Sequence, residues 1–198
     1  MKKEFLPYNT VRNNSFKLAS SMLKQNYVPD VIYASLRGGC CMANCISEFF
    51  KVACPQKNII FGAVIASSYS GVQSHSSVSI QGWNPEPVSL SGKNILLVDD
   101  IFDSGQTINF LVENLISQGV PAQTVKIAVH DYKIFTYKEP HKHVPDFFCR
   151  KFVINSPEDD LWIHYSSHEL VGLSLNELEE HYFKEDSSLR PVLSPFFC

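Results

Sequence analysis

The segment ILLVDDIFDSGQT, residues 95–107, joins an apolar run to three acidic residues and a turn of small residues. An uninterrupted apolar run such as Ile95–Val98 is typical of a strand buried on both faces, as in a parallel sheet. Asp99, Asp100 and Asp103 follow it closely, and like charges at this spacing repel one another unless something offsets them. The segment therefore predicts a core strand whose carboxyl end carries a ligand site.

The loop from Asp103 to Thr107 lies between that strand and a helix predicted from about Gln106 to Gln118. Gly105 permits a tight turn, and the amide N–H groups at the start of the helix, with the Ser104 and Thr107 hydroxyls, form a cradle for phosphate. The paired carboxylates upstream suit the vicinal hydroxyls of a sugar. A ribose 5-phosphate carries both groups, so we expect a sugar-phosphate site.

Strands and helices alternate along most of the chain. This alternation predicts an α/β fold, an open and mainly parallel twisted sheet flanked by helices, with ligands at the carboxyl ends of its strands. The expected strands are 31–35, 58–68, 94–100, 124–132, 146–154 and 161–165, with a strand pair around a turn at 82–87, and the expected helices are 9–26, 40–50, 106–118 and 174–183.

The composition excludes several classes of protein. The 198 residues suit one domain, and 17 Lys and Arg against 20 Asp and Glu give a net charge of −3, so nucleic acid is not expected as a partner. No apolar run approaches the roughly 20 residues of a membrane helix, and no leader segment is evident, so we expect a cytoplasmic protein without membrane contact. The six cysteines are expected to be buried thiols rather than zinc ligands.

Residues 95–107 resemble the phosphoribosyl-diphosphate (PRPP) motif of the type I phosphoribosyltransferases: four apolar residues, two acids, two further residues, then Asp-Ser/Thr-Gly-x-Thr. The resemblance implies that Asp99 and Asp100 bind the ribose hydroxyls and, partly through water, Mg²⁺. It also implies that Asp103 is the catalytic general base at a purine nitrogen. The 5-phosphate would be bound by Asp103, Ser104, Gly105, Gln106 and Thr107.

Two further segments resemble loops of the same family. SLRGG, residues 35–39, is similar to its pyrophosphate loop, in which Leu36, Arg37 and Gly38 would bind the diphosphate and the Leu36–Arg37 peptide bond is often cis. An ordinary turn is the alternative interpretation of this loop. SSY, residues 67–69, is similar to the mobile lid of the 6-oxopurine members, with Ser68 and Tyr69 closing over the reaction.

The resemblance assigns purine binding to three residues. Lys133 would donate to the exocyclic oxygen of a 6-oxopurine, Trp162 would stack on the base, and the backbone of Ile163 would contact its edge. A solvated lysine and a core tryptophan are the alternatives. Where purine members commonly have Pro-Trp-acid, this chain has SSHE, residues 166–169, so either Glu169 replaces the acid or the pocket differs.

The resemblance as a whole implies a Mg²⁺-dependent pentosyltransferase of purine salvage. It would use PRPP and guanine, xanthine or hypoxanthine to make a nucleoside monophosphate and pyrophosphate, as a homodimer or homotetramer. A PRPP-sensing regulatory protein of the same fold, or a phosphoribosyltransferase for another base, is the alternative. We expect a single phosphoribosyltransferase domain over 1–198, with a core at about 28–135, a small hood at about 136–170, and a carboxyl-terminal helical tail at 174–198.

Overall fold

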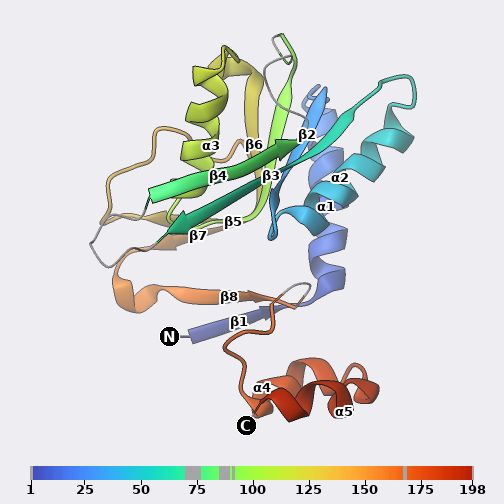
Figure 1. Cartoon of the computed structure of the whole chain (residues 1–198), viewed down its shortest axis with the longest axis vertical. Coiled ribbons are helices and arrows are strands. Elements are labelled where there is room, and N and C mark those ends of the chain that lie inside the picture. Colours follow the sequence, from blue (N-terminus) through green and yellow to red (C-terminus); the bar gives the residue numbers. More distant parts are fainter. Residues whose placement is uncertain (1, 70–76, 85–89, 91, 167–168, 198) are drawn as a thin grey trace. The chain divides into compact units, whose positions relative to one another are not determined.

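The computed structural model describes residues 2–69, 77–84, 90, 92–166 and 169–197 (Figure 1). The chain forms two compact units. Residues 9–160 make the larger one, called the sheet unit below, and residues 1–8 together with 161–198 make the smaller one, called the terminal unit. The functional division into core, hood and tail stays a prediction.

A six-stranded sheet lies at the centre of the sheet unit, with strand order β4-β3-β2-β5-β6-β7 (Figure 1). Neighbouring strands are parallel except β3 and β4, which are antiparallel. The predicted α/β fold with an open, mainly parallel sheet is therefore confirmed. The strands are β2 (Val31–Leu36), β3 (Ile60–Tyr69), β4 (Ser77–Asn84), β5 (Ile95–Phe102), β6 (Val125–Phe135) and β7 (Phe147–Ile154).

Helices cover both faces of this sheet because its central strands are apolar on both sides. Ile95 and Leu97 of β5 pack in one cluster with α3 (Gln106–Ser117). Leu96 and Val98, which point the other way, pack with α1 (Tyr8–Lys24) and α2 (Cys40–Ala53). Since β2, β5 and β6 are parallel neighbours, the loops that follow them meet at one edge of the sheet.

One prediction about the strands is wrong. The segment 82–87 was expected to be a turn between two strands, but Gly82, Trp83 and Asn84 belong to β4, which pairs with the preceding strand β3. The Trp83 ring packs edge-on against Tyr33 of the core, 4.8 Å between ring centroids. Packing of this partly buried side chain against the core favours an extended strand over a solvent-facing turn. Residues 85–87 lie outside the described residues.

The terminal unit joins the two ends of the chain. Its strand β1 (Lys2–Leu6) pairs in parallel with β8 (Leu161–Tyr165). The helix predicted at 174–183 is split into α4 (Leu175–Leu178) and a π-helical turn at Glu179–Phe183, and α5 (Arg190–Leu193) follows. The predicted capping box between Ser174 and Glu177 is confirmed. Short 3-10 turns complete the two units at Ala122–Thr124, Pro157–Asp159, Ser187–Leu189 and Ser194–Phe196.

The helices in the described part of the chain are all too short or too polar to cross a membrane.

Candidate active site

Two carboxylates stand at the carboxyl end of β5, the strand predicted to carry the site. Asp99 and Asp100 are both half-buried. The Asp100 amide donates to Asp99 Oδ1 at 3.0 Å, and the Ile101 amide donates to Asp100 Oδ1 at 2.8 Å. These backbone bonds hold the two carboxylates at the edge of the sheet.

The surroundings of this pair disfavour two negative charges. Burial raises the pKa of Asp99 well above its usual range, and the charge of Asp100 raises it further. Hydrogen bonds from the Ser35 hydroxyl and the Asp100 amide offset only part of this shift. The pair is therefore suited to a ligand that brings hydroxyl donors or positive charge.

The residues following the acid pair make a tight turn into α3, where a phosphate loop is predicted. Gly105 precedes α3 with φ of +67°, a left-handed conformation that favours glycine. A Cβ atom at Gly105 would also lie 2.5 Å from the Phe102 ring and 2.7 Å from the His141 ring. A cavity of about 210 Å³ opens in front of this loop, and it is lined by Asp99, Asp100, Ile101, Asp103, Ser104, Gly105, Thr107 and Ile108.

The glycine loop after β2 packs directly onto the acid pair. A Cβ atom at Gly38 would lie 2.4 Å from the Asp100 carboxyl carbon, and one at Gly39 would lie 2.2 Å from the Val98 carbonyl oxygen. The Leu36–Arg37 peptide bond is cis, as the resemblance implied, and the Arg37 side chain is exposed. The loop predicted to bind diphosphate therefore lies against the carboxylates, and its binding role stays a prediction.

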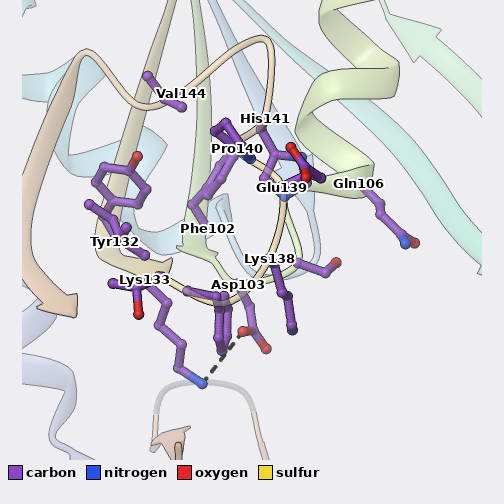
Figure 2. Close-up of a pocket in the computed structure, with 14 residues that line it drawn as sticks. Phe102, Asp103, Gln106, Tyr132, Lys133, Lys138, Glu139, Pro140, His141 and Val144 are labelled. Atoms are coloured by element: carbon purple, nitrogen blue, oxygen red, sulfur yellow. Dashed lines mark ion pairs between the residues drawn. The ribbon is translucent and has the colours of Figure 1, made fainter. Parts of the chain in front are cut away.

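Lys133, near the end of β6, reaches the same region from the neighbouring strand. Its side chain is only 4% exposed, and its Nζ lies 2.7 Å from Asp160 Oδ1 and 3.5 Å from Asp103 Oδ1. Figure 2 shows the lysine extending toward Asp103, with this longer ion pair dashed. The alternative of a solvated lysine is wrong, because a buried ammonium held between two carboxylates is a feature of an organised site.

A larger cavity of about 580 Å³ adjoins this ion pair (Figure 2). Aromatic and apolar side chains form much of its wall: Phe102, Tyr132, Phe135, Pro140, His141 and Val144. Between the lining residues His141 and Val144, His143 is bonded to α3: Asn109 Oδ1 accepts from its amide at 2.9 Å, and Asn109 Nδ2 donates to its carbonyl at 2.9 Å. The His143 ring also hydrogen-bonds to Glu113 of α3 at 2.5 Å, so residues 141–143 are held against this helix.

Trp162 and Ile163, the other predicted purine contacts, lie on β8 of the terminal unit. The Trp162 residue is 49% exposed, so the alternative of a core tryptophan is wrong, whereas Ile163 is buried. Glu169 accepts from the Tyr165 amide at 2.9 Å within the same unit. The base-binding roles of these residues stay predictions.

The lid prediction falls largely outside the described residues. The backbone of Ser68 and Tyr69 ends strand β3, but their side chains and residues 70–76 are not described. The lid therefore stays a prediction.

Ser35 and Asp160 lie beside the predicted site residues, although the sequence assigned neither of them a role. Ser35 is buried beside Asp99, and Asp160 holds Lys133. A carboxylate placed directly before the apolar run LWIHY was the signal available for Asp160. In the described parts of the chain, no group of three or more His, Cys, Asp or Glu side chains is placed to hold a metal ion.

The sequence profile described as phosphoribosyl transferase domain matches residues 8–161 of the chain. Xanthine phosphoribosyltransferase 1 of Saccharomyces cerevisiae is 30% identical over 134 residues, 61% of this chain and 64% of the yeast protein. The bifunctional protein PyrR of Streptococcus equi subsp. zooepidemicus is 46% identical over 43 residues, 22% of this chain and 24% of that protein. The chain thus matches less than two thirds of the length of these curated relatives.

Two solved structures of similar fold align with most of the chain. A hypothetical protein from Neisseria gonorrhoeae with bound ppGpp has a TM-score of 0.69 at 24% identity, over 90% of this chain and 94% of that chain. A purine phosphoribosyltransferase from Pyrococcus horikoshii Ot3 has a TM-score of 0.65 at 24% identity, over 88% of this chain and 99% of that chain. Both likenesses agree with the parallel-sheet architecture.

Proposed function

Because the chain belongs to the phosphoribosyl transferase domain family, we propose that it transfers the 5-phosphoribosyl group of PRPP to a 6-oxopurine. One observation supports this proposal above the others: the glycine loop, the acid pair and the phosphate loop meet at one edge of the sheet, with no room for a Cβ atom between Gly38 and Asp100. The likeness to a xanthine phosphoribosyltransferase supports a purine as the acceptor. The products are a nucleoside monophosphate and pyrophosphate.

Binding uses the loops at the edge of the sheet. Residues 104–107, at the start of α3, hold the 5-phosphate through amides and hydroxyls. Asp99 and Asp100 accept hydrogen bonds from the two ribose hydroxyls, which relieves the repulsion between the carboxylates. The exposed Arg37 and the amides of the Leu36–Gly38 loop hold the diphosphate.

The transfer exchanges one bond at ribose C1 for another. A purine ring nitrogen forms a bond to C1, and the C1–oxygen bond breaks so that pyrophosphate leaves with the electron pair. The transition state has oxocarbenium character, as in glycoside cleavage. Asp103 accepts the proton that the purine nitrogen loses, and its 46% exposed side chain is open to the substrate side. Closure by Ser68 and Tyr69 would exclude water, which otherwise hydrolyses PRPP.

The acid pair also suits Mg²⁺, which binds through one or two carboxylates together with substrate oxygens. Burial and the charge of Asp100 raise the pKa of Asp99, so a bound cation would stabilise the ionised pair. Asp99 and Asp100 would hold the ion, partly through water. When bound, Mg²⁺ supplies charge neutralisation for the diphosphate leaving group.

In this proposal, base selection rests on Lys133 of the sheet unit. The Lys133 ammonium donates to the exocyclic oxygen of a 6-oxopurine, an acceptor that adenine lacks. For two residues of the terminal unit the family resemblance implies further roles: the half-exposed Trp162 would stack on a base, and the Ile163 backbone would contact a base edge. We propose that the protein works in the cytoplasm as a homodimer or homotetramer; light scattering after size exclusion tests the oligomer.

The test is a panel of purine and pyrimidine bases with PRPP and Mg²⁺, read as nucleotide formed. We expect turnover with guanine, xanthine or hypoxanthine, and its loss in excess EDTA. Turnover with none of these three would overturn the proposal, and turnover with another base alone would replace the acceptor. PRPP-dependent retention of RNA or DNA in a gel-shift assay, without turnover, would favour a regulatory protein instead.

A further inference from the structure

Lys133 and Asp160 form a tight ion pair next to Asp103. The Lys133 Nζ donates to Asp160 Oδ1 at 2.7 Å, a hydrogen-bonding distance. Its separation of 3.5 Å from Asp103 Oδ1 is longer and corresponds to an ion pair rather than a hydrogen bond. Asp160 is therefore the stronger of these two carboxylate contacts.

Because both side chains are largely buried, this ion pair determines where the Lys133 charge lies. The Lys133 side chain is almost fully enclosed and that of Asp160 is 23% exposed, so neither charge is freely hydrated. A buried ammonium is costly without a close partner, and the geometry of that partner then fixes where the charge lies. Asp160 comes from outside β6, directly after the turn Pro157–Asp159, and so acts on Lys133 from a separate segment.

We propose that Asp160 is a positioning residue: it holds the Lys133 ammonium away from direct hydrogen bonding to Asp103 and fixes its position for contact with the 6-oxo group of the base. This inference rests on the proposed function. A lysine ammonium has three donors, and Asp160 accepts one of them. Without Asp160, Lys133 is expected to move onto Asp103, which would occupy the general base and remove the donor from the purine.

The same arrangement explains discrimination between bases. A 6-oxo group accepts from the fixed ammonium, whereas the 6-amino group of adenine presents donors to it and cannot accept this hydrogen bond. A site built to make a hydrogen bond to the base discriminates more strongly than one that differs only in apolar contact. Asp160 thus sets specificity without touching the base.

The test compares Asp160→Asn with Asp159→Asn, the same chemical change at the adjacent, exposed residue. We expect Asp160→Asn to lower kcat/KM for the 6-oxopurine roughly 10–100-fold, mainly through the KM for the base, and to reduce the preference over adenine. The KM for PRPP should stay within about twofold, which also reports an intact fold. Asp160→Glu should recover part of the loss, and Asp159→Asn should behave as wild type.

A double-mutant cycle shows whether Asp160 acts through Lys133. If it does, Lys133→Met with Asp160→Asn is no more impaired than Lys133→Met alone. Additive losses, or an unchanged base preference in Asp160→Asn, would overturn the inference.

A second readout does not need activity. Acetic anhydride labelling of Lys133, mapped by peptide mass spectrometry, should be slow in wild type and in Asp159→Asn and several-fold faster in Asp160→Asn. Equal labelling in all three proteins overturns the positioning role. A wild-type protein that uses no 6-oxopurine but shows this labelling difference would refute the proposed function while leaving the Lys133–Asp160 pairing supported.

Discussion

Gly38 occupies a position where a single added carbon would collide with the acid pair. We predict that Gly38→Ala displaces the Asp100 carboxylate and raises the KM for PRPP roughly tenfold or more, since the new Cβ atom would lie 2.4 Å from the Asp100 carboxyl carbon. Steady-state kinetics with varied PRPP measures the effect. Gly82→Ala is the matched control, because a Cβ atom there meets nothing within 4 Å. An unchanged KM in Gly38→Ala would contradict the contact.

Asp103 is the proposed general base. Replacing it with asparagine removes the proton acceptor while keeping the shape of the side chain, so the variant separates proton transfer from PRPP binding. We predict that Asp103→Asn lowers kcat about 10²-fold or more, because the amide cannot accept the purine proton as a carboxylate does. PRPP binding, followed by calorimetry in the presence of Mg²⁺, should be retained. Wild-type turnover in this variant would remove Asp103 from the base role.

The positions of the candidate site residues were predictable where these residues are contiguous in the sequence. Asp99, Asp100 and residues 103–107 lie on one strand and the loop after it, so their order along the chain already determines their order in space. The Lys133–Asp160 pair was not predictable, because its two partners are 27 residues apart and meet only after β6 and β7 have paired.

At the scale of elements, α4 depends on a charge in the terminal unit. Glu177 accepts from the Ser174 amide at 2.7 Å and pairs with Lys3 at 2.9 Å. The Lys3 ammonium, then the Ser174 bonds, lower the pKa of Glu177 to about 2 from an ordinary value of 4.5. Because the folded pKa is the lower one, this carboxylate stabilises the fold above about pH 4.5, and the contribution is lost as the pH falls toward about 2.

We therefore predict that Glu177→Gln increases hydrogen exchange in residues 175–183 at pH 7. Glutamine can still serve in a capping box, so the loss reports mainly the charge. The difference from wild type should shrink between pH 4.5 and pH 2, with each pair of proteins compared at the same pH. Glu180→Gln, at an exposed position in the same segment, is the control, and an equal effect there would contradict a specific role for Glu177.

The elements that the sequence could predict are those with an intrinsic pattern. Strand β5 follows from its apolar run, and α4 follows from its capping box. Strand β1 has neither: KKEFL carries charges at three of its five positions and becomes a strand through pairing with β8. Its existence depends on a partner far along the chain, which local periodicity does not reveal.

At the scale of the whole molecule, substrate binding should be visible as stability. We predict that PRPP with Mg²⁺, at about 100 times its Kd, stabilises the protein by about 2.7 kcal/mol and raises Tm by roughly 5–10 °C. Differential scanning fluorimetry measures the shift. EDTA should abolish most of it, because the acid pair is left without the cation, and a shift that persists in EDTA would contradict the role of the metal.

The overall architecture was predictable because alternating strands and helices, with apolar central strands, leave few arrangements other than a parallel sheet. The division into two units was not, since it arises from the pairing of β1 with β8.

That pairing has a consequence for how the protein is made. Residues 2–6 are synthesised well before residues 161–165, and at ordinary translation rates the interval is about 10–30 s. Throughout that time the sheet unit is emerging while β1 has no strand beside it, and unpaired strand edges promote association with other chains. A chain interrupted before residue 161 would contain the complete phosphate loop and acid pair yet keep β1 unpaired, so prematurely terminated products are expected to aggregate and to be targets for chaperones and proteases during synthesis.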